Sequence, residues 1–284
     1  MKVAVIGTGL IGGSLALDLK ASAFCDYVIG VESNTDHAKQ ALERKLVDEI
    51  SSLQTAVKKS DLIIIAVPVD VAITLLPSIL EMIDNQVVID VGSTKEPIIK
   101  SVSEKSNRGR FVATHPIWGT EHSGPRAALS GGFNGKITVI CNRNESDADA
   151  LLLVEKMYES IGMKTIYMDA VSHDIHAAYV SHISHITSFA LALSVLEKEK
   201  EVDTIFQLAG AGFESTVRLA KSSPDTWIPI FKQNRSNILD VLNEQIYQLK
   251  QMKKLLEMEE FETFYKLVKQ ANEIEKILNN KETV

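Results

Sequence analysis

Short apolar runs alternate with amphipathic patterns of helical length over the first half of the chain. The runs predict strands, and the amphipathic patterns predict helices between them. The expected strands are Lys2–Ile6, Tyr27–Val31, Leu62–Val67, Gln86–Val91, Phe111–Thr114, Lys136–Cys141 and Lys164–Met168, and the expected helices lie near Ile11–Ala21, Thr35–Arg44, Val71–Met82 and Asp147–Ser160. Several runs are apolar throughout, which is typical of strands buried on both faces of a parallel sheet. The alternation predicts a doubly wound α/β domain with a mostly parallel sheet.

The pattern changes character at about Ala170. From there on, apolar residues recur three and four positions apart, as at Ile238 and Leu242, and no strand pattern is found. We therefore predict an α/β domain over residues 1–166 and an all-helical domain over residues 167–284. Long amphipathic helices of this kind pack either within one chain or against a second subunit.

Composition narrows the classes of function. The chain has 284 residues, of which 45% are apolar and 24% charged, and its net charge is −7. Such a composition suits two packed domains, and because neither half is basic, a nucleic-acid partner is not expected. The apolar runs are far shorter than the roughly 20 residues that span a bilayer, so no membrane segment is predicted. The N-terminus lacks a signal-peptide pattern, and Cys25 and Cys141 form no CxxC pair, which favours the cytoplasm.

A glycine-rich turn joins the first strand to the first helix. Gly7 permits a tight turn, Gly9 allows backbone to approach a pyrophosphate, and Gly12 lets the helix lie close to the strand. The helix start at Leu10 and Ile11 would offer free N–H groups to the phosphates. The turn therefore predicts a Rossmann-type dinucleotide site, although a turn that only joins strand to helix is the alternative.

Further cofactor contacts are expected where the next strands end. Glu32 lies 20 residues beyond Gly12, where a carboxylate accepts hydrogen bonds from ribose hydroxyls and repels a 2′-phosphate. We therefore predict NAD in preference to NADP, with a plain solvated Glu32 as the alternative. Val67 and Pro68 follow the strongest strand run and would line the nucleotide crevice, unless Pro68 only ends the strand.

The strand exits at Ser93 and His115 are where chemistry is expected. Ser93 could form a hydrogen bond near the nicotinamide, or it could cap a helix that starts at Thr94. His115 directly follows a strand beside the expected nicotinamide position, where an imidazole is a natural base for a substrate hydroxyl. His122, further along the same loop, is expected to be a surface residue.

Four histidines occur as two close pairs, His173 with His176 and His182 with His185. At about 100° per residue, a straight helix would turn the two pairs to different sides, so no metal site is predicted. One or two of these histidines would instead form a wall of a substrate site. Arg218 lies in a mostly apolar helical pattern and needs an anionic partner, either a substrate carboxylate or an internal salt bridge.

Five ordered segments together resemble one enzyme family. They are GTGLIGGSLALDL, DVGSTK, HPIWGTEHSGPRAA, HDIHAAYVSHISH and LAGAGFESTVRLAKSSPDTWIPIF, and they cover most of residues 1–240. The set resembles the prephenate/arogenate dehydrogenases of tyrosine biosynthesis. The resemblance implies NAD-dependent oxidative decarboxylation of prephenate to 4-hydroxyphenylpyruvate, by a homodimer formed through the helical domain.

The resemblance also implies a role for each matching residue. His115 would be the base on the ring hydroxyl, Ser93 would bond the same hydroxyl and help to orient His115, and Arg218 would hold the ring carboxylate. The other matching positions are His173, His182 and His185 as pocket-lining histidines, Thr120 and Glu121 in a gating loop, and Trp227 near the substrate end.

The sequence departs from the family pattern at two positions. Ser184 stands where many members have a proline between the paired histidines, and Glu214 stands where many have a basic residue. The first change removes a possible helix kink beside His185; nothing in the sequence explains the second. Arogenate dehydrogenase and a non-catalytic NAD sensor are the alternatives. The preference between prephenate and arogenate, and inhibition by tyrosine, stay open at the level of sequence.

Overall fold

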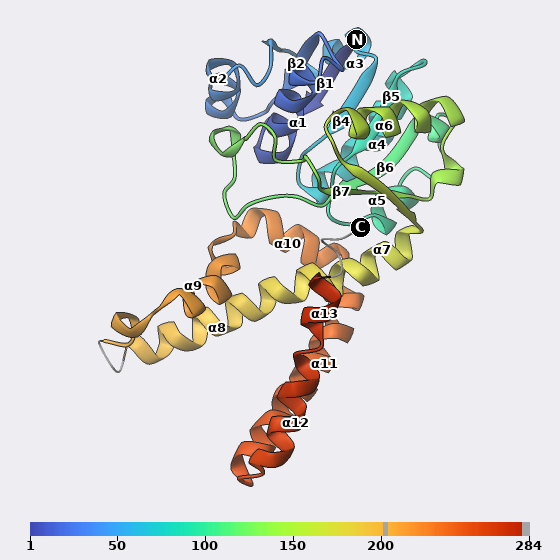
Figure 1. Cartoon of the computed structure of the whole chain (residues 1–284). Helices are drawn as coiled ribbons and strands as arrows, with labels where there is room; N and C mark the ends of the chain where they lie inside the picture. Colours follow the sequence, from blue (N-terminus) through green and yellow to red (C-terminus); the bar gives the residue numbers. More distant parts are fainter. Residues whose placement is uncertain (201–203, 280–284) are drawn as a thin grey trace. The chain divides into compact units, whose positions relative to one another are not determined.

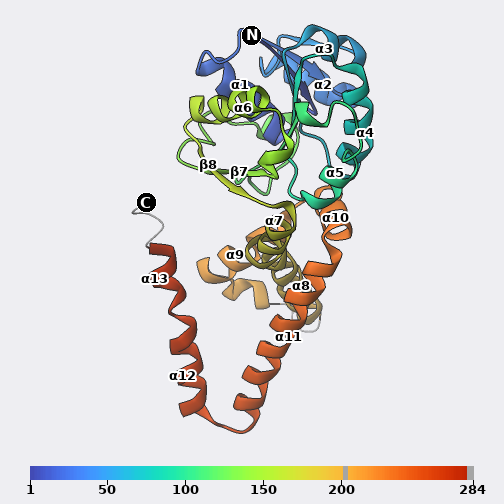
Figure 2. The same cartoon turned by 90° about the vertical axis from the view of Figure 1, so that its right-hand side faces the viewer.

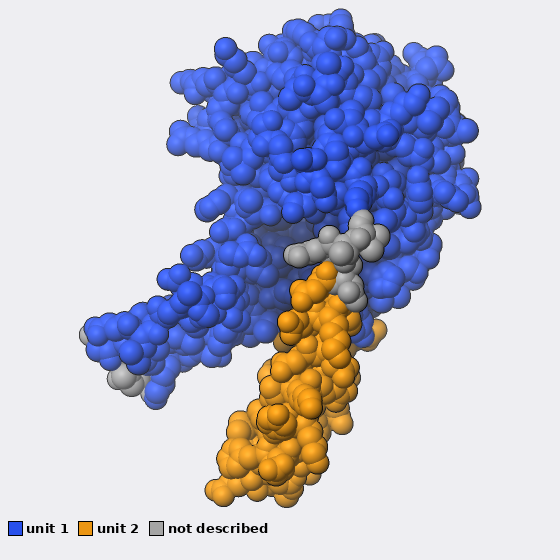
Figure 3. Space-filling model, viewed as in Figure 1, with its two compact units in different colours: residues 1–237 blue, residues 238–284 orange. Residues whose placement is uncertain are grey.

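The computed structural model describes residues 1–200 and 204–279. Internal contacts divide the chain into two compact units, residues 1–237 and residues 238–284 (Figure 3). The first unit contains the sheet, the helices that cover it and the first helices of the carboxyl-terminal half. The last strand ends at Met168, and every described element after it is helical (Figure 1).

Eight strands form one sheet in the order β3-β2-β1-β4-β5-β6-β7-β8. Their bounds are β1 (Lys2–Ile6), β2 (Tyr27–Val31), β3 (Glu49–Ile50), β4 (Leu62–Ile65), β5 (Val87–Asp90), β6 (Phe111–Pro116), β7 (Ile137–Cys141) and β8 (Lys164–Met168). All neighbours are parallel except β6 and β7, which are antiparallel. The predicted α/β fold with a mostly parallel sheet is confirmed. The two-residue β3 was missed because it is too short to form an apolar run.

Helices cover both faces of the sheet. The clusters of buried apolar side chains assign α1 (Leu10–Ala21), α2 (Thr35–Glu43) and α6 (Ala148–Ser160) to one face and α3 (Leu53–Lys59), α4 (Val69–Met82) and α5 (Glu96–Lys100) to the other. Within β1, Val3 and Val5 belong to the first cluster, whereas Ala4 and Ile6 belong to the second. Successive side chains of a strand point to opposite faces, so a strand covered on both sides must be apolar throughout.

A continuous helix of 30 residues, Ala170–Glu199, follows the sheet (Figure 1). It consists of α7 (Ala170–Ala177), a π-helical turn η4 (Ala178–His182) and α8 (Ile183–Glu199). A π-helical turn contains more residues than an α-helical one, so it changes which side the later residues face. His173, His182 and His185 are all buried, whereas His176 is exposed. The argument about the two histidine pairs assumed a straight α-helix, and the π-helical turn contradicts that assumption.

This helix also bears on the prediction that the chain has no membrane segment. Among the described residues it is the one helix that is long and apolar enough to cross a membrane by length and composition. Polar residues such as His182 interrupt its apolar runs, so run length alone missed it. A single such helix is a weak indication of membrane insertion, and its buried histidines face protein.

Shorter helices complete the first unit. They are α9 (Ala211–Val217), α10 (Pro224–Gln233) and the 3₁₀ turns η1 (Arg108–Arg110), η2 (Pro125–Ala127), η3 (Arg143–Glu145), η5 (Ile205–Leu208) and η6 (Arg218–Lys221). The second unit contains most of α11 (Arg235–Glu257), with α12 (Phe261–Ala271) and α13 (Ile274–Asn279). Figure 2 shows α12 turning back from the end of α11 and diverging from it.

A buried ion pair joins the ends of β5 and β6. The Lys95 ammonium donates to the Asp90 carboxylate and, at 2.6 Å, to the carbonyl oxygen of Thr114. Lys95 is fully buried and Asp90 is 1% exposed. The Thr114 hydroxyl in turn donates to the carbonyl of Asp90 at 2.6 Å. The two strands are thus cross-linked at the residue immediately before His115.

Replacing Lys95→Met is expected to lower the free energy of unfolding by about 3–5 kcal/mol, because it leaves the Asp90 carboxylate buried without a cation. Urea unfolding followed by circular dichroism measures the loss. Lys59→Met is the matched control, since Lys59 is half exposed in its pair with Glu49 and should cost no more than about 1 kcal/mol. Equal effects of the two substitutions would contradict the assignment.

Candidate active site

The glycine turn has the geometry that a dinucleotide site requires. Gly7 has φ of +92°, and a Cβ there would lie 2.4 Å from the carbonyl oxygen of Ala66. A Cβ on Gly12 would lie 2.1 Å from the carbonyl oxygen of Gly7. Gly9 differs, because a Cβ there would meet no atom within 4 Å of the described structure. Gly7 and Gly12 therefore permit the close packing of strand, turn and helix, and open space lies in front of Gly9.

The start of α1 offers hydrogen-bond donors beside this space. Gly9 is the N-cap, and no side chain among the described residues caps the helix. The N–H groups at Leu10 and Ile11 precede the first internal helical bond, which runs from Gly13 N to Gly9 O at 2.9 Å. Free donors and the positive end of the helix dipole suit a pyrophosphate. The residues present thus fit a dinucleotide.

Glu32 lies beside the same turn. It follows β2, and its carboxylate accepts hydrogen bonds from Thr8 N at 3.1 Å and Thr8 Oγ1 at 3.0 Å. Asn34 N donates to the other oxygen at 3.1 Å. A carboxylate has about four acceptor positions, so Glu32 retains capacity for a ribose hydroxyl. On the other side of the turn, Val67 packs against Gly7, while the exposed Pro68 is the N-cap of α4.

His115 is held by a second histidine. It lies near the end of β6, partly exposed, and its Nδ1 is 2.8 Å from Nε2 of His173. Its other ring nitrogen has no hydrogen-bond partner in the described part of the chain. Burial lowers the pKa of His115 well below 6.5, and the neighbouring His173, Lys95 and His182 act in the same direction. His115 is therefore a neutral imidazole at neutral pH, as a base must be.

Ser93 does not cap a helix. The next helix, α5, begins at Glu96 and not at Thr94, and its first N–H groups are capped from another element. Asp174 accepts from Lys95 N at 2.8 Å and from Glu96 N at 3.0 Å. The Ser93 hydroxyl has no hydrogen-bond partner among the described residues, His115 included. Its side chain is partly buried and remains available to a ligand.

His182, His185 and Trp227 form an aromatic cluster. The rings of His185 and Trp227 stack with centroids 3.4 Å apart, and His182 meets Trp227 edge-on at 5.9 Å. The Asn234 amide nitrogen donates to the carbonyl of Asp174 at 2.6 Å and lies 3.1 Å from Nδ1 of His182. His182 Nδ1 is then an acceptor, which leaves the proton of the neutral ring on Nε2.

The Nε2 atom of His182 is buried and has no partner in the described structure. Burial lowers the pKa of His182 to about 4, so the ring stays neutral. A buried donor without an acceptor costs about 1–3 kcal/mol. The cluster therefore contains one buried polar group that no described residue satisfies.

Arg218 lies on the surface and pairs with Glu121. Its Nη1 is 3.2 Å from the Glu121 carboxylate, and its side chain is 53% exposed. The expectation of an apolar setting was wrong, because η6 and α9 are not packed into a core. A salt bridge within the chain, which was the alternative to a substrate carboxylate, is present and joins two predicted site residues. Burial lowers the pKa of His185, and the cation of Arg218 acts in the same direction.

The last of the predicted site residues is Thr120. Thr120 is exposed, and its hydroxyl accepts from the backbone N–H of His122 at 3.3 Å. His122 and Glu214 are exposed. Among the described residues, no group of three histidine, cysteine or acidic side chains is arranged to hold a metal ion.

Sequence reasoning missed four polar residues that build this site. They are Asp90, Lys95, Asp174 and Asn234. Asp90 ends an apolar strand, and Asp174 directly follows His173. An acidic residue in such an apolar setting is the signal that a buried partner exists. The identity of each partner depends on contacts between elements far apart in the sequence.

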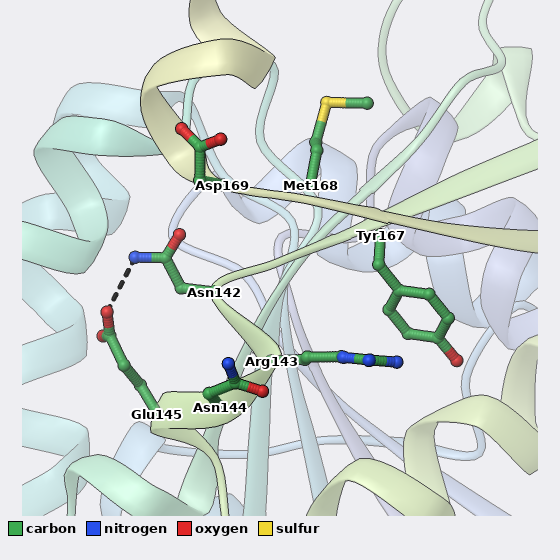
Figure 4. A pocket seen from close by; sticks show the side chains of 7 residues that line it. All are labelled: Asn142, Arg143, Asn144, Glu145, Tyr167, Met168 and Asp169. Carbon is green, nitrogen blue, oxygen red and sulfur yellow. Dashed lines mark hydrogen bonds between the residues drawn. The ribbon is translucent and has the colours of Figure 1, made fainter.

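A surface pocket of about 480 Å³ has no histidine in its lining (Figure 4). It is lined by Asn142, Arg143, Asn144, Glu145, Tyr167, Met168 and Asp169, none of which was predicted as a site residue. The Asn142 side chain accepts from Ala170 N at 2.8 Å and donates to Glu145 at 2.7 Å. These bonds anchor the start of α7, which carries His173 and Asp174.

The chain is similar to known proteins of one family. The family model of the prephenate dehydrogenase nucleotide-binding domain matches residues 15–167, and that of the prephenate dehydrogenase dimerization domain matches residues 169–270. Prephenate dehydrogenase of Bacillus subtilis is 29% identical over 248 residues, which are 86% of this chain and 67% of that protein.

Two solved structures share the fold. Prephenate dehydrogenase from Aquifex aeolicus, in complex with hydroxyphenyl propionate and NAD+, has a TM-score of 0.85 at 28% identity over 96% of both chains. Synechocystis arogenate dehydrogenase has a TM-score of 0.75 at 28% identity, over 96% of this chain and 98% of that one. Because the two family models together match most of its residues, the chain belongs to the prephenate dehydrogenase family.

Proposed function

We propose that this protein oxidises prephenate with NAD to 4-hydroxyphenylpyruvate and carbon dioxide, as an enzyme of tyrosine biosynthesis. The observation that carries the proposal is His115, a neutral imidazole with one bare nitrogen at the end of β6. The loop that follows it reaches the cofactor turn, since a Cβ on Gly119 would lie 4.0 Å from Ile11. This contact supports a base at His115 near a dinucleotide bound at the turn.

The cofactor residues are the turn Gly7–Gly12, Glu32, Val67 and Pro68. Leu10 and Ile11 supply N–H groups for the pyrophosphate, and Glu32 accepts from the adenosine ribose. A carboxylate at that position repels a 2′-phosphate, which favours NAD over NADP. When bound, NAD accepts the hydride.

The mechanism follows from the side chains around the ring hydroxyl. His115 accepts the hydroxyl proton through Nε2 while hydride leaves the same ring carbon for NAD. Loss of carbon dioxide from the opposite ring carbon then makes the ring aromatic. Ser93 would bond the same hydroxyl. Because aromatisation is strongly favourable, the protein's main task is to position the reacting groups.

The substrate carboxylate is assigned to Arg218. In the structure this guanidinium holds Glu121, and a ring carboxylate would take the place of that side chain. His173, His182, His185 and Trp227 would line the pocket, with His182 donating from Nε2 to a substrate oxygen. Thr120 and Glu121 lie on the loop that follows β6 and would move as the substrate enters.

We infer that the protein is a homodimer through its helical half. Large apolar side chains are exposed on the described helices of both units, for example Val180 at 78%, Leu208 at 91%, Leu249 at 57% and Tyr265 at 67%. Large exposed apolar side chains of this kind are typical of a subunit interface. The dimerization-domain match over residues 169–270 supports the same assignment. The two free, buried cysteines agree with a reducing cytoplasm.

Assays of two variants separate the proposed role of His115 as the base from that of Arg218 in binding the substrate carboxylate. His115→Asn is expected to lower kcat with prephenate by about 10²–10⁴ and leave NAD affinity unchanged, because only the base is lost. Arg218→Ala is expected to raise KM for prephenate by roughly 10- to 100-fold, because the substrate carboxylate loses a charge-assisted hydrogen bond. NADH absorbance measures both, and assays with arogenate test the alternative substrate.

The exposed His122→Asn and Arg126→Ala are the matched controls for these variants and should behave as the unaltered protein does. Absence of NADH formation from both prephenate and arogenate would refute the proposed function. An unchanged KM in Arg218→Ala would show that Arg218 does not bind the substrate carboxylate.

Sedimentation equilibrium at micromolar concentration is expected to give twice the chain mass of 31.3 kDa. Leu249→Asp should weaken the association, because it places a charge on an apolar face, whereas Lys250→Asp on the neighbouring exposed position should not. A monomeric mass for the unaltered chain would contradict the dimer.

A further inference from the structure

Three side chains stand in line behind the reacting nitrogen of His115. Nδ1 of His115 is 2.8 Å from Nε2 of His173, and Nδ1 of His173 is 2.7 Å from Oδ1 of Asp174. His173 is 3% exposed and Asp174 is 2% exposed. The direct hydrogen bonds therefore run from a ligand-facing imidazole to a buried carboxylate.

The carboxylate decides the direction of both hydrogen bonds. An ionised carboxylate only accepts, so Nδ1 of His173 must donate to Asp174. In neutral His173 the proton is then on Nδ1, and Nε2 is an acceptor for the Nδ1–H of His115. Neutral His115 consequently has its bare nitrogen at Nε2, which is the form that a base needs.

The line of residues has no outlet to solvent at its Asp174 end. Asp174 also accepts from the backbone N–H groups of Lys95 and Glu96, so both of its oxygens are engaged within the protein. The proposed reaction does not require an outlet. The hydroxyl loses its proton as the C–O double bond forms and hydride leaves. The electron pair of the breaking C–CO₂ bond then returns through the ring to the oxygen, which takes a proton again.

We propose that His173 and Asp174 are positioning residues that hold His115 with a bare Nε2, and that His115 keeps the substrate's own proton and returns it to the product oxygen. The proposal rests on the proposed function. Asp174 acts through His173 and does not itself take up the proton, in the way that a buried aspartate orients a catalytic histidine in hydrolases. By capping α5, Asp174 also holds the loop that carries Ser93.

The charged and titratable groups around His115 are His173 and Asp174 on α7, Asp90 and Lys95 at the end of β5, and His182 on η4. Asp90 is paired with Lys95, so Asp174 is the anion connected to His115 by hydrogen bonds. Its negative charge favours the imidazolium that forms during turnover. Without it, the acid limb of the kcat/KM profile should move to lower pH.

Asp174→Asn is expected to lower kcat by roughly 10- to 100-fold and to move that acid limb down by about one pH unit. KM for prephenate should change little, because Asp174 does not touch the ligand. The matched control is Asp18→Asn. Asp18 is 6% exposed and accepts from Ser130 and Gly131, but it has no link to His115. A folded Asp174→Asn with an unshifted acid limb would overturn the proposal.

His173 provides an independent test if Asp174→Asn does not fold. His173→Gln can still accept from His115 through its amide oxygen but loses the connection to the carboxylate, whereas His173→Leu loses both. The expected order of kcat is unaltered protein, then His173→Gln, then His173→Leu. Equal kcat in all three refutes the positioning role, whereas a lack of prephenate turnover in the unaltered protein refutes the proposed function itself.

Discussion

The site depends on a charge that must be neutralised inside the protein. The ammonium of Lys95 is fully buried, and its interactions with Asp90 and the carbonyl of Thr114 join the ends of two neighbouring strands. Removing either charge would leave the other in a medium where an unpaired ion is very costly. The pair therefore fixes the backbone directly before His115. The backbone N–H of the same Lys95 then binds Asp174, which connects the sheet to the helix that follows it.

The attraction of anionic ligands to the site depends on individual groups near it and not on the net charge of the chain. The chain carries a net charge of −7, yet its proposed ligands, a dinucleotide and a dicarboxylate, are anions. Attraction must come from placed groups, namely the free N–H donors at the start of α1 and the guanidinium of Arg218. In the structure Glu121 occupies that guanidinium, so a substrate carboxylate bound to Arg218 would replace one carboxylate with another. Such an exchange leaves the number of ion pairs unchanged.

Local sequence pattern was enough to predict the elements and several site positions. The all-apolar strand runs follow from burial on both faces, and the glycines at 7 and 12 follow from the space between strand, turn and helix. His115 was predicted as a site residue because strand ends line the crevice of such a sheet. These features depend on residues close together in the sequence, so a local pattern can predict them.

The features that sequence reasoning missed depend on distant contacts. The side chain that caps α5 belongs to Asp174, 78 residues away from Glu96. The sequence offered Ser93 as a cap because it lies close to the helix start, and that alternative was wrong. The π-helical turn before Ile183 carries no local sequence signal, yet it decides which side His182 and His185 face. The exposure of Arg218 likewise depends on how α9 and η6 pack, which an apolar pattern alone does not determine.

The central claim is that a buried hydrogen-bonded network presents a neutral His115 to the substrate. The most direct test is the pH dependence of kcat/KM for prephenate oxidation by the unaltered protein with saturating NAD. Since burial lowers the pKa of His115, the base stays competent as the pH falls through the ordinary histidine value of 6.5, and activity should decline only well below it. A decline centred at or above that value would contradict the account.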